Sequence, residues 1–102
     1  MSILHTVNRS PFERNSLNTC LGYALPGSAI LFYEDGVYAG LKGAATESQV
    51  AAATKDRKVY VLGPDLSARG FGADQLIDGI EVVDYAGFVD LAASADKVQA
   101  WL

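Results

Sequence analysis

Short apolar runs recur along the chain and are separated by polar turns or by apolar positions at helical spacing. These runs predict strands at residues 3–7, 29–33, 59–62 and 80–83. The second run is almost wholly apolar, which is typical of a strand buried on both faces of a parallel sheet. Residues 98–102 are expected to form either a short fifth strand or a docked tail.

An amphipathic helix is predicted after the first strand. Ser10-Pro11-Phe12-Glu13 has the form of a capping box with proline at the first helical position. The apolar positions beyond it follow the spacing i, i+3, i+4, i+7, i+8, which predicts one apolar helix face. That face consists of Leu17, Cys20, Leu21, Ala24 and Leu25, and Pro26-Gly27 ends the helix.

The middle of the chain is expected to hold a turn and two helical segments. Residues 34–36 predict a turn, and residues 37–45 predict a short helix despite their glycines. Thr46 and Gln49 suggest a second capping box, which opens a helix that runs to about Thr54.

Two aspartates are expected to cap the later helices. Asp65 follows Gly63-Pro64 and predicts a short helix that ends near Gly70, with a loop over residues 71–79. Asp84 predicts the cap of a last helix, whose apolar face consists of Phe88, Leu91, Ala92 and Ala95.

Strands that alternate with helices favour an α/β fold with a mainly parallel, four- or five-stranded sheet and helices on both faces. The chain has 102 residues, half of them hydrophobic, so we expect a single domain over residues 1–102. The functional end of such a sheet is the carboxyl edge of its strands. The segments expected there are residues 8–11, 34–36, 63–65 and 84–85.

Composition narrows the classes of function. A net charge of −4 argues against a nucleic-acid partner, and the basic run Lys55 to Lys58 is interpreted as a solvated loop. One cysteine and one histidine cannot form a zinc site, and no phosphate-binding glycine pattern is present, so no cofactor is expected. Neither a signal peptide nor a membrane span is predicted, which favours a cytoplasmic protein.

Cys20 is the first candidate for chemistry, because a thiolate can attack or carry sulfur. Its place on the apolar helix face equally fits a small buried packing residue. A functional thiol at a subunit interface is the other interpretation, and the pattern leaves both open.

For other polar residues, a structural role is an alternative to a functional one. His5 lies within a strand and is expected to have a structural or interface role rather than a catalytic one. Arg9, near a helix N-terminus, could bind an anion or simply face solvent. The strand-end aspartates could form a metal or acid–base cluster, although each also has a cap or turn role; they are Asp35, Asp65 and Asp84.

Apolar residues in loops and at the end of the chain are candidates for a subunit interface, where aromatic side chains are enriched. They are Tyr38, Phe71, Trp101 and Leu102.

Several segments form a series that covers nearly the whole chain: residues 4–11 (Leu-His-Thr-Val-Asn-Arg-Ser-Pro), 34–37 (Glu-Asp-Gly-Val), 59–62 (Val-Tyr-Val-Leu), 65–70 (Asp-Leu-Ser-Ala-Arg-Gly), Asp84-Tyr85 with Phe88-Val89, and Ala100-Trp101-Leu102. In this order the series resembles the TusB/DsrH family of DsrE-like sulfur-relay proteins. It is most similar to DsrH, of the intracellular sulfur-oxidation complex DsrEFH.

The resemblance implies a DsrE-like fold and a heterohexamer with two copies each of this chain and of two paralogous subunits, DsrE/DsrF-like or TusD/TusC-like. Such a complex passes persulfide sulfur to a small acceptor protein that resembles DsrC or TusE. The main expectation is a role in intracellular sulfur oxidation. The alternative is a TusB-like subunit for the 2-thiolation of wobble uridine in tRNA.

One departure from the family pattern concerns the sulfur carrier. In the sulfur-bearing paralogue, the carrier cysteine ends the third strand, before a helix that ends in Arg-Gly. Counting back from Arg69-Gly70 places Leu62 at that position, and leucine cannot carry sulfur. A cysteine placed like Cys20 is typical of DsrH-type members, so Cys20 is the candidate auxiliary persulfide carrier.

Three hypotheses remain open at the level of sequence. The chain is an assembly subunit of the complex, a sulfurtransferase in its own right through Cys20, or a small-ligand binder that uses the strand-end crevice.

Overall fold

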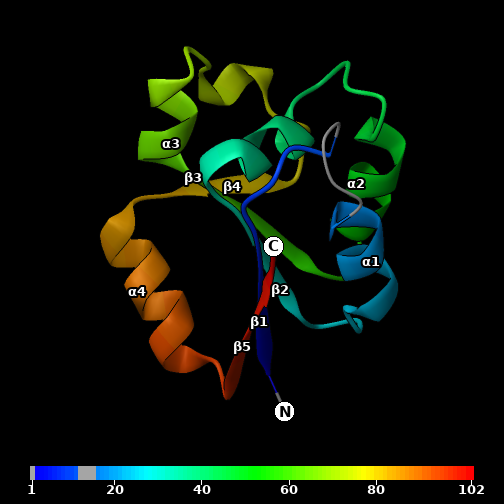
Figure 1. Cartoon of the computed structure of the whole chain (residues 1–102), viewed down its shortest axis with the longest axis vertical. Coiled ribbons are helices and arrows are strands. Elements are labelled where there is room, and N and C mark those ends of the chain that lie inside the picture. The colour runs from blue at the N-terminus through cyan, green and yellow to red at the C-terminus, as the bar shows by residue number, and fades with distance from the viewer. Residues whose placement is uncertain (1, 12–15) are drawn as a thin grey trace.

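A fully parallel sheet of five strands organises the computed structural model, which describes residues 2–11 and 16–102 (Figure 1). The strands lie in the order β4-β3-β2-β1-β5, and every neighbouring pair is parallel. They are β1 (Ile3–Val7), β2 (Ala29–Phe32), β3 (Lys58–Leu62), β4 (Ile80–Val83) and β5 (Lys97–Trp101). The predicted α/β class is confirmed, and the chain end forms a fifth strand rather than a docked tail.

Helices cover both faces of the sheet. On one face, here called the core face, the buried side chains of Ile30, Phe32 and Val61 pack against α1 (Ser16–Tyr23), α2 (Glu47–Ala53) and the 3₁₀ helix η1 (Glu34–Gly40). On the opposite face, here called the α4 face, lies α4 (Tyr85–Ser94). Since β4 and β5 are the two edge strands, the α4 connection spans the whole sheet (Figure 1).

The carboxyl edge of the sheet is covered by η1 and by α3 (Gly63–Ala68), which follow β2 and β3 directly. The prediction that Asp65 caps α3 is wrong. The helix begins at Gly63, with Pro64 in its first turn, and no side chain caps it. Its N-cap is Leu62, and the Asp65 carboxylate is engaged elsewhere, as described below.

Four other local predictions need correction. Residues 34–36 are not a turn but the start of η1, and no helix forms over residues 41–45. The predicted loop 71–79 contains a short 3₁₀ helix, η2 (Ala73–Gln75). Thr46 precedes α2 as predicted, but its side chain caps nothing, and its buried hydroxyl has no hydrogen-bond partner.

The apolar face of α1 is confirmed except at its end. Leu17, Cys20 and Ala24 are buried, whereas Leu25 is exposed, because α1 ends at Tyr23 and helical spacing no longer applies beyond that residue. The predicted capping box at residues 10–13 falls partly on residues 12–15, outside the described part of the chain.

Two further predictions were tested at the ends of helices. Asp84 is the N-cap of α4 as predicted, and its carboxylate accepts a hydrogen bond from the Gly87 amide at 2.8 Å. Arg57 does not belong to a solvated run, because its side chain is largely buried and donates to the Leu21 carbonyl at the end of α1. Among the described residues, no helix has the length and apolar character to cross a membrane.

Candidate functional site

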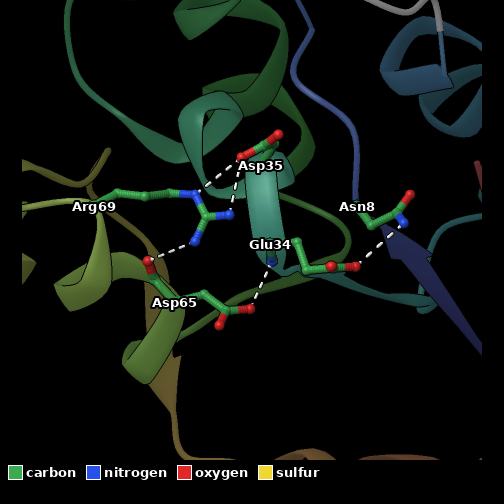
Figure 2. Close-up of polar contacts among 5 residues, drawn as sticks. All are labelled: Asn8, Glu34, Asp35, Asp65 and Arg69. Carbon is green, nitrogen blue, oxygen red and sulfur yellow. Dashed lines mark hydrogen bonds and ion pairs between the residues drawn. The ribbon is translucent and has the colours of Figure 1, made fainter.

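Polar side chains from three adjacent strand ends meet at the carboxyl edge of the sheet (Figure 2). The Asn8 amide, just beyond β1, donates to the Glu34 carboxylate, just beyond β2, at 3.3 Å. The backbone amide of Glu34 in turn donates to the Asp65 carboxylate, beyond β3, at 2.6 Å. The sequence placed these segments at one edge, but it did not single out Asn8 or Glu34.

An ion pair extends this cluster along η1 and α3. The Arg69 guanidinium donates twice to one carboxylate oxygen of Asp35, at 3.0 and 2.9 Å, and once to the backbone carbonyl of Asp65. It ties the end of α3 to the start of η1 (Figure 2). Both side chains are partly exposed, so the pair positions the two helices more than it stabilises the fold.

The backbone at this edge is constrained. A side chain at Gly36 would meet the Val7 carbonyl oxygen at 2.1 Å, so only glycine fits there. Glu34 has a φ of 49°, in the left-handed region that residues other than glycine rarely adopt. The side-chain oxygen of Asn8 is buried without a hydrogen-bond partner. Strained backbone and unsatisfied polar atoms concentrate at functional surfaces, which makes this edge the candidate site.

No side chain at this edge of the sheet can carry sulfur. Leu62, at the position that corresponds to the carrier cysteine in the family resemblance, is buried at the end of β3. The chain has one cysteine, and Cys20 is on α1 instead. The edge can therefore bind or orient a partner through carboxylate, amide and guanidinium groups, but it offers no thiol.

The proposed metal or acid–base cluster does not form. Asp35 pairs with Arg69, Asp65 accepts from the Glu34 amide, and Asp84 caps α4. No group of three or more potential ligands occurs among the residues that the structure describes.

Cys20 lies within the core cluster, fully buried on the core face. Burial raises the pKa of its thiol to about 12, although the nearby Arg57 guanidinium opposes that rise. The thiol is therefore protonated at neutral pH, whereas sulfur chemistry requires the thiolate. These observations agree with the packing interpretation, and the carrier role stays a prediction.

His5 has a structural environment. It is buried on the core face, and its Nδ1 accepts a hydrogen bond from the Trp101 indole at 3.1 Å. Burial lowers the pKa of His5, which keeps the imidazole neutral. The ring of Tyr23 lies 5.7 Å from that of Trp101, so the fold itself uses these aromatic groups.

Most of the apolar residues predicted for an interface are also used within the fold. The rings of Tyr38 and Phe71 meet edge to face at 5.8 Å, and Trp101 packs against the core cluster, whereas Leu102 is exposed. Arg9 is exposed as well. The anion site predicted for it depends partly on residues 12–15, which lie outside the described residues.

Known proteins match this chain along nearly its whole length. The TusB proteins of Photorhabdus laumondii and Yersinia enterocolitica are 35% and 34% identical to it, over 97% of this chain and 100% of their own. The ychN protein from E. coli has the same fold, with a TM-score of 0.86 over 98% of both chains at 23% identity.

A second solved structure, a protein of unknown function from Methanobacterium thermoautotrophicum, superposes with a TM-score of 0.74 at 16% identity, over 96% of this chain and 97% of its own. The model of the family described as DsrH like protein matches residues 9–98. With this match and the full-length TusB relatives, the chain belongs to the DsrH-like family, which is the TusB/DsrH family that its sequence resembles.

Proposed function

We propose that this chain is a single-domain, cytoplasmic assembly subunit of a sulfur-relay complex that serves the 2-thiolation of wobble uridine in tRNA. The observation that carries the proposal is Leu62, buried at the family's carrier position in a chain that otherwise keeps the family fold. A member that keeps the fold but has lost the carrier thiol contributes surface rather than sulfur chemistry. Its partners are two paralogous TusC- and TusD-like subunits and a TusE-like acceptor.

The relatives' names favour one of the two branches of the family. The sequence favoured sulfur oxidation, but the full-length relatives are named TusB, which supports the tRNA branch instead. Sulfur oxidation within a DsrEFH-like complex, with a DsrC-like acceptor, is the second candidate. It rests on Cys20, the feature that resembles DsrH-type members.

Deletion of the gene followed by mass spectrometry of tRNA tests the proposal. We expect 2-thiouridine at the wobble position to fall sharply in the deletion strain and to return with the wild-type chain. Normal thiolation in that strain would contradict the proposal. If sulfur oxidation were impaired in the same strain, the second candidate would replace it.

The carboxyl-edge cluster gives the complex a surface that can meet an acceptor protein. Substituting Arg69→Gln removes the charged pair with Asp35 and leaves the core untouched. If the edge contacts the acceptor, this variant still assembles but passes sulfur more slowly to the TusE-like protein. The exposed Lys55, outside the cluster, provides a matched control as Lys55→Gln.

An auxiliary carrier role for Cys20 requires one chemical step. A Cys20 thiolate attacks the outer sulfur of a donor persulfide, the donor's sulfur–sulfur bond breaks, and the donor leaves as a thiolate. Mass spectrometry of the assembled complex after exposure to a persulfide donor would then show one added sulfur atom on Cys20. Full thiolation of tRNA by a Cys20→Ser complex would argue against this role.

A further inference from the structure

The helix α4 is mostly apolar, and Asp90 is its only charged residue. A helix of this composition is normally enclosed in a protein interior. Here none of its ten residues is buried. The helix therefore has more apolar surface than this single chain buries.

One side of α4 packs on the sheet, and the opposite side is exposed to solvent. The inner side faces the sheet, with Phe88, Leu91, Ala92 and Ala95 half-buried there. On the outer side, Tyr85 and Val89 are one helical turn apart, and their side chains are 59% and 65% exposed. The exposed Ala86 and Ala93 extend this apolar side, here called the outer α4 stripe.

Acidic residues predominate on α4 and on the segments next to it, and the basic residue that follows, Lys97, lines a hollow with His5 and Tyr23 on the core face. Between Gly70 and Asp96 the chain has no lysine or arginine. Four exposed acidic residues lie on α4 or on the segments that lead into and out of it: Glu81, Asp84, Asp90 and Asp96. Lys58 lines a hollow beneath the C-terminal half of α4, and thus lies on the sheet side of the helix.

We propose that the outer α4 stripe is the contact surface for one of the paralogous subunits, and that this partner presents an apolar patch bordered by lysine and arginine. The inference rests on the proposed function, which supplies the complex. Charge complementarity selects the partner, because acidic residues around an apolar centre match a basic border. A second copy of this chain would bring the same acidic border against this one, and like charges disfavour that pairing.

Another exposed apolar region provides an internal control. Leu25 lies in the loop after α1 and is 68% exposed, close to the value for Val89. Its surroundings carry both signs of charge rather than an acidic border. The Gly27 amide donates to the backbone carbonyl of Asp56 at 2.8 Å, and the Arg57 guanidinium donates to the Ala24 carbonyl at 3.3 Å. Leu25→Asp and Val89→Asp therefore place the same charge on two aliphatic positions of similar exposure.

The test is co-expression of the full chain with tagged TusC- and TusD-like subunits, followed by measurement of the affinity between this chain and the rest of the complex. We expect Val89→Asp to weaken binding by about tenfold or more and Leu25→Asp to leave it within about twofold. Circular dichroism and thermal unfolding establish that both variants fold. The reverse order, with Leu25→Asp disruptive and Val89→Asp neutral, would overturn the inference, as would two neutral variants.

A charge-reversal variant keeps the test informative if Val89→Asp fails to fold. Asp90→Lys alters the acidic border without changing any packed side chain, and we expect slower association and a weaker dependence on salt. Unchanged association for Asp90→Lys would overturn the basic-bordered partner. If the wild-type chain binds neither paralogue, the proposed function fails, which is distinguishable from loss in the α4 variants alone.

Discussion

The two faces of the sheet differ in the relation between helix composition and burial. On the core face, α1 contains serine, asparagine and threonine, yet Leu17 and Cys20 are completely enclosed. On the α4 face, a helix with one charged residue has no buried residue at all. The chain's own core therefore accounts for the apolar pattern of α1. The apolar pattern of α4 goes beyond that core, which is the basis of the contact surface proposed above.

Topology explains this difference. The core face receives α1, η1 and α2, whose side chains enclose one another as well as the sheet. On the α4 face, the crossover from β4 to β5 runs over the sheet as one helix, and no α4 side chain belongs to the core cluster. We therefore expect the folding free energy to reside mainly on the core face.

The largest effect is expected from truncation in the centre of the core face. Phe32 is fully buried, and Phe32→Ala should lower the free energy of unfolding by about 3–5 kcal/mol through lost burial and the cavity left behind. Val89→Ala, on the outer α4 stripe, should change it by no more than about 0.5 kcal/mol. Urea unfolding measures both. Comparable losses would show that the outer α4 stripe stabilises the fold as much as the core face does.

A smaller effect is expected from the buried thiol of Cys20 at the first pH unit above its unfolded pKa of 9.0. Its pKa is raised from 9.0 to about 12 in the folded chain, so the unfolded chain ionises first. The stabilisation is complete below the unfolded pKa and is lost between the two values, at about 1.4 kcal/mol per pH unit.

Cys20→Ala is the reference for this measurement, because lysines and tyrosines titrate in both proteins. Above about pH 9 the wild-type chain should lose stability more steeply than the variant, as followed by urea unfolding at successive pH values. Parallel curves would mean that the folded thiol ionises normally, which would favour the sulfur-carrier interpretation of Cys20.

The strands could be predicted from sequence because their signal is local. Each apolar run became a strand within a residue or so of its expected bounds, and Asp84 caps α4 as its position indicated. The cap predicted at Asp65 was wrong because its carboxylate instead accepts from the Glu34 amide, 31 positions away. Only the folded chain brings those two groups together.

The candidate site shows the same limit. Parallel strands place their ends at one edge, so the location of the site followed from the strand pattern. The pairing of Asp35 with Arg69 spans 34 positions, and neither residue lies in a motif that indicates the other. The burial of Arg57 against the end of α1 was missed for the same reason, because the basic run around it looked solvated.

The smallest effect is expected at the cap of α4. Asp84→Ala removes the acceptor of the Gly87 amide and should cost about 1 kcal/mol. Because α4 is outside the core cluster, we expect the loss to be local. Hydrogen exchange should quicken at the amides of Phe88 and Leu91 and stay slow in β2 and β3. Asp90→Ala, on the same helix but away from its cap, is the matched control.

The distribution of faster hydrogen exchange in Asp84→Ala tests the contrast between the two faces more directly than the lost free energy of unfolding does. Faster exchange throughout the sheet in Asp84→Ala would mean that α4 and the core face unfold as one unit, and the contrast between the two faces would not hold. Faster exchange in α4 alone would mean that packing on the sheet does not by itself keep this helix fully folded. In that case, adding the paralogous subunits should restore slow exchange to α4 in Asp84→Ala, since a partner that covers the outer α4 stripe stabilises the helical state it binds.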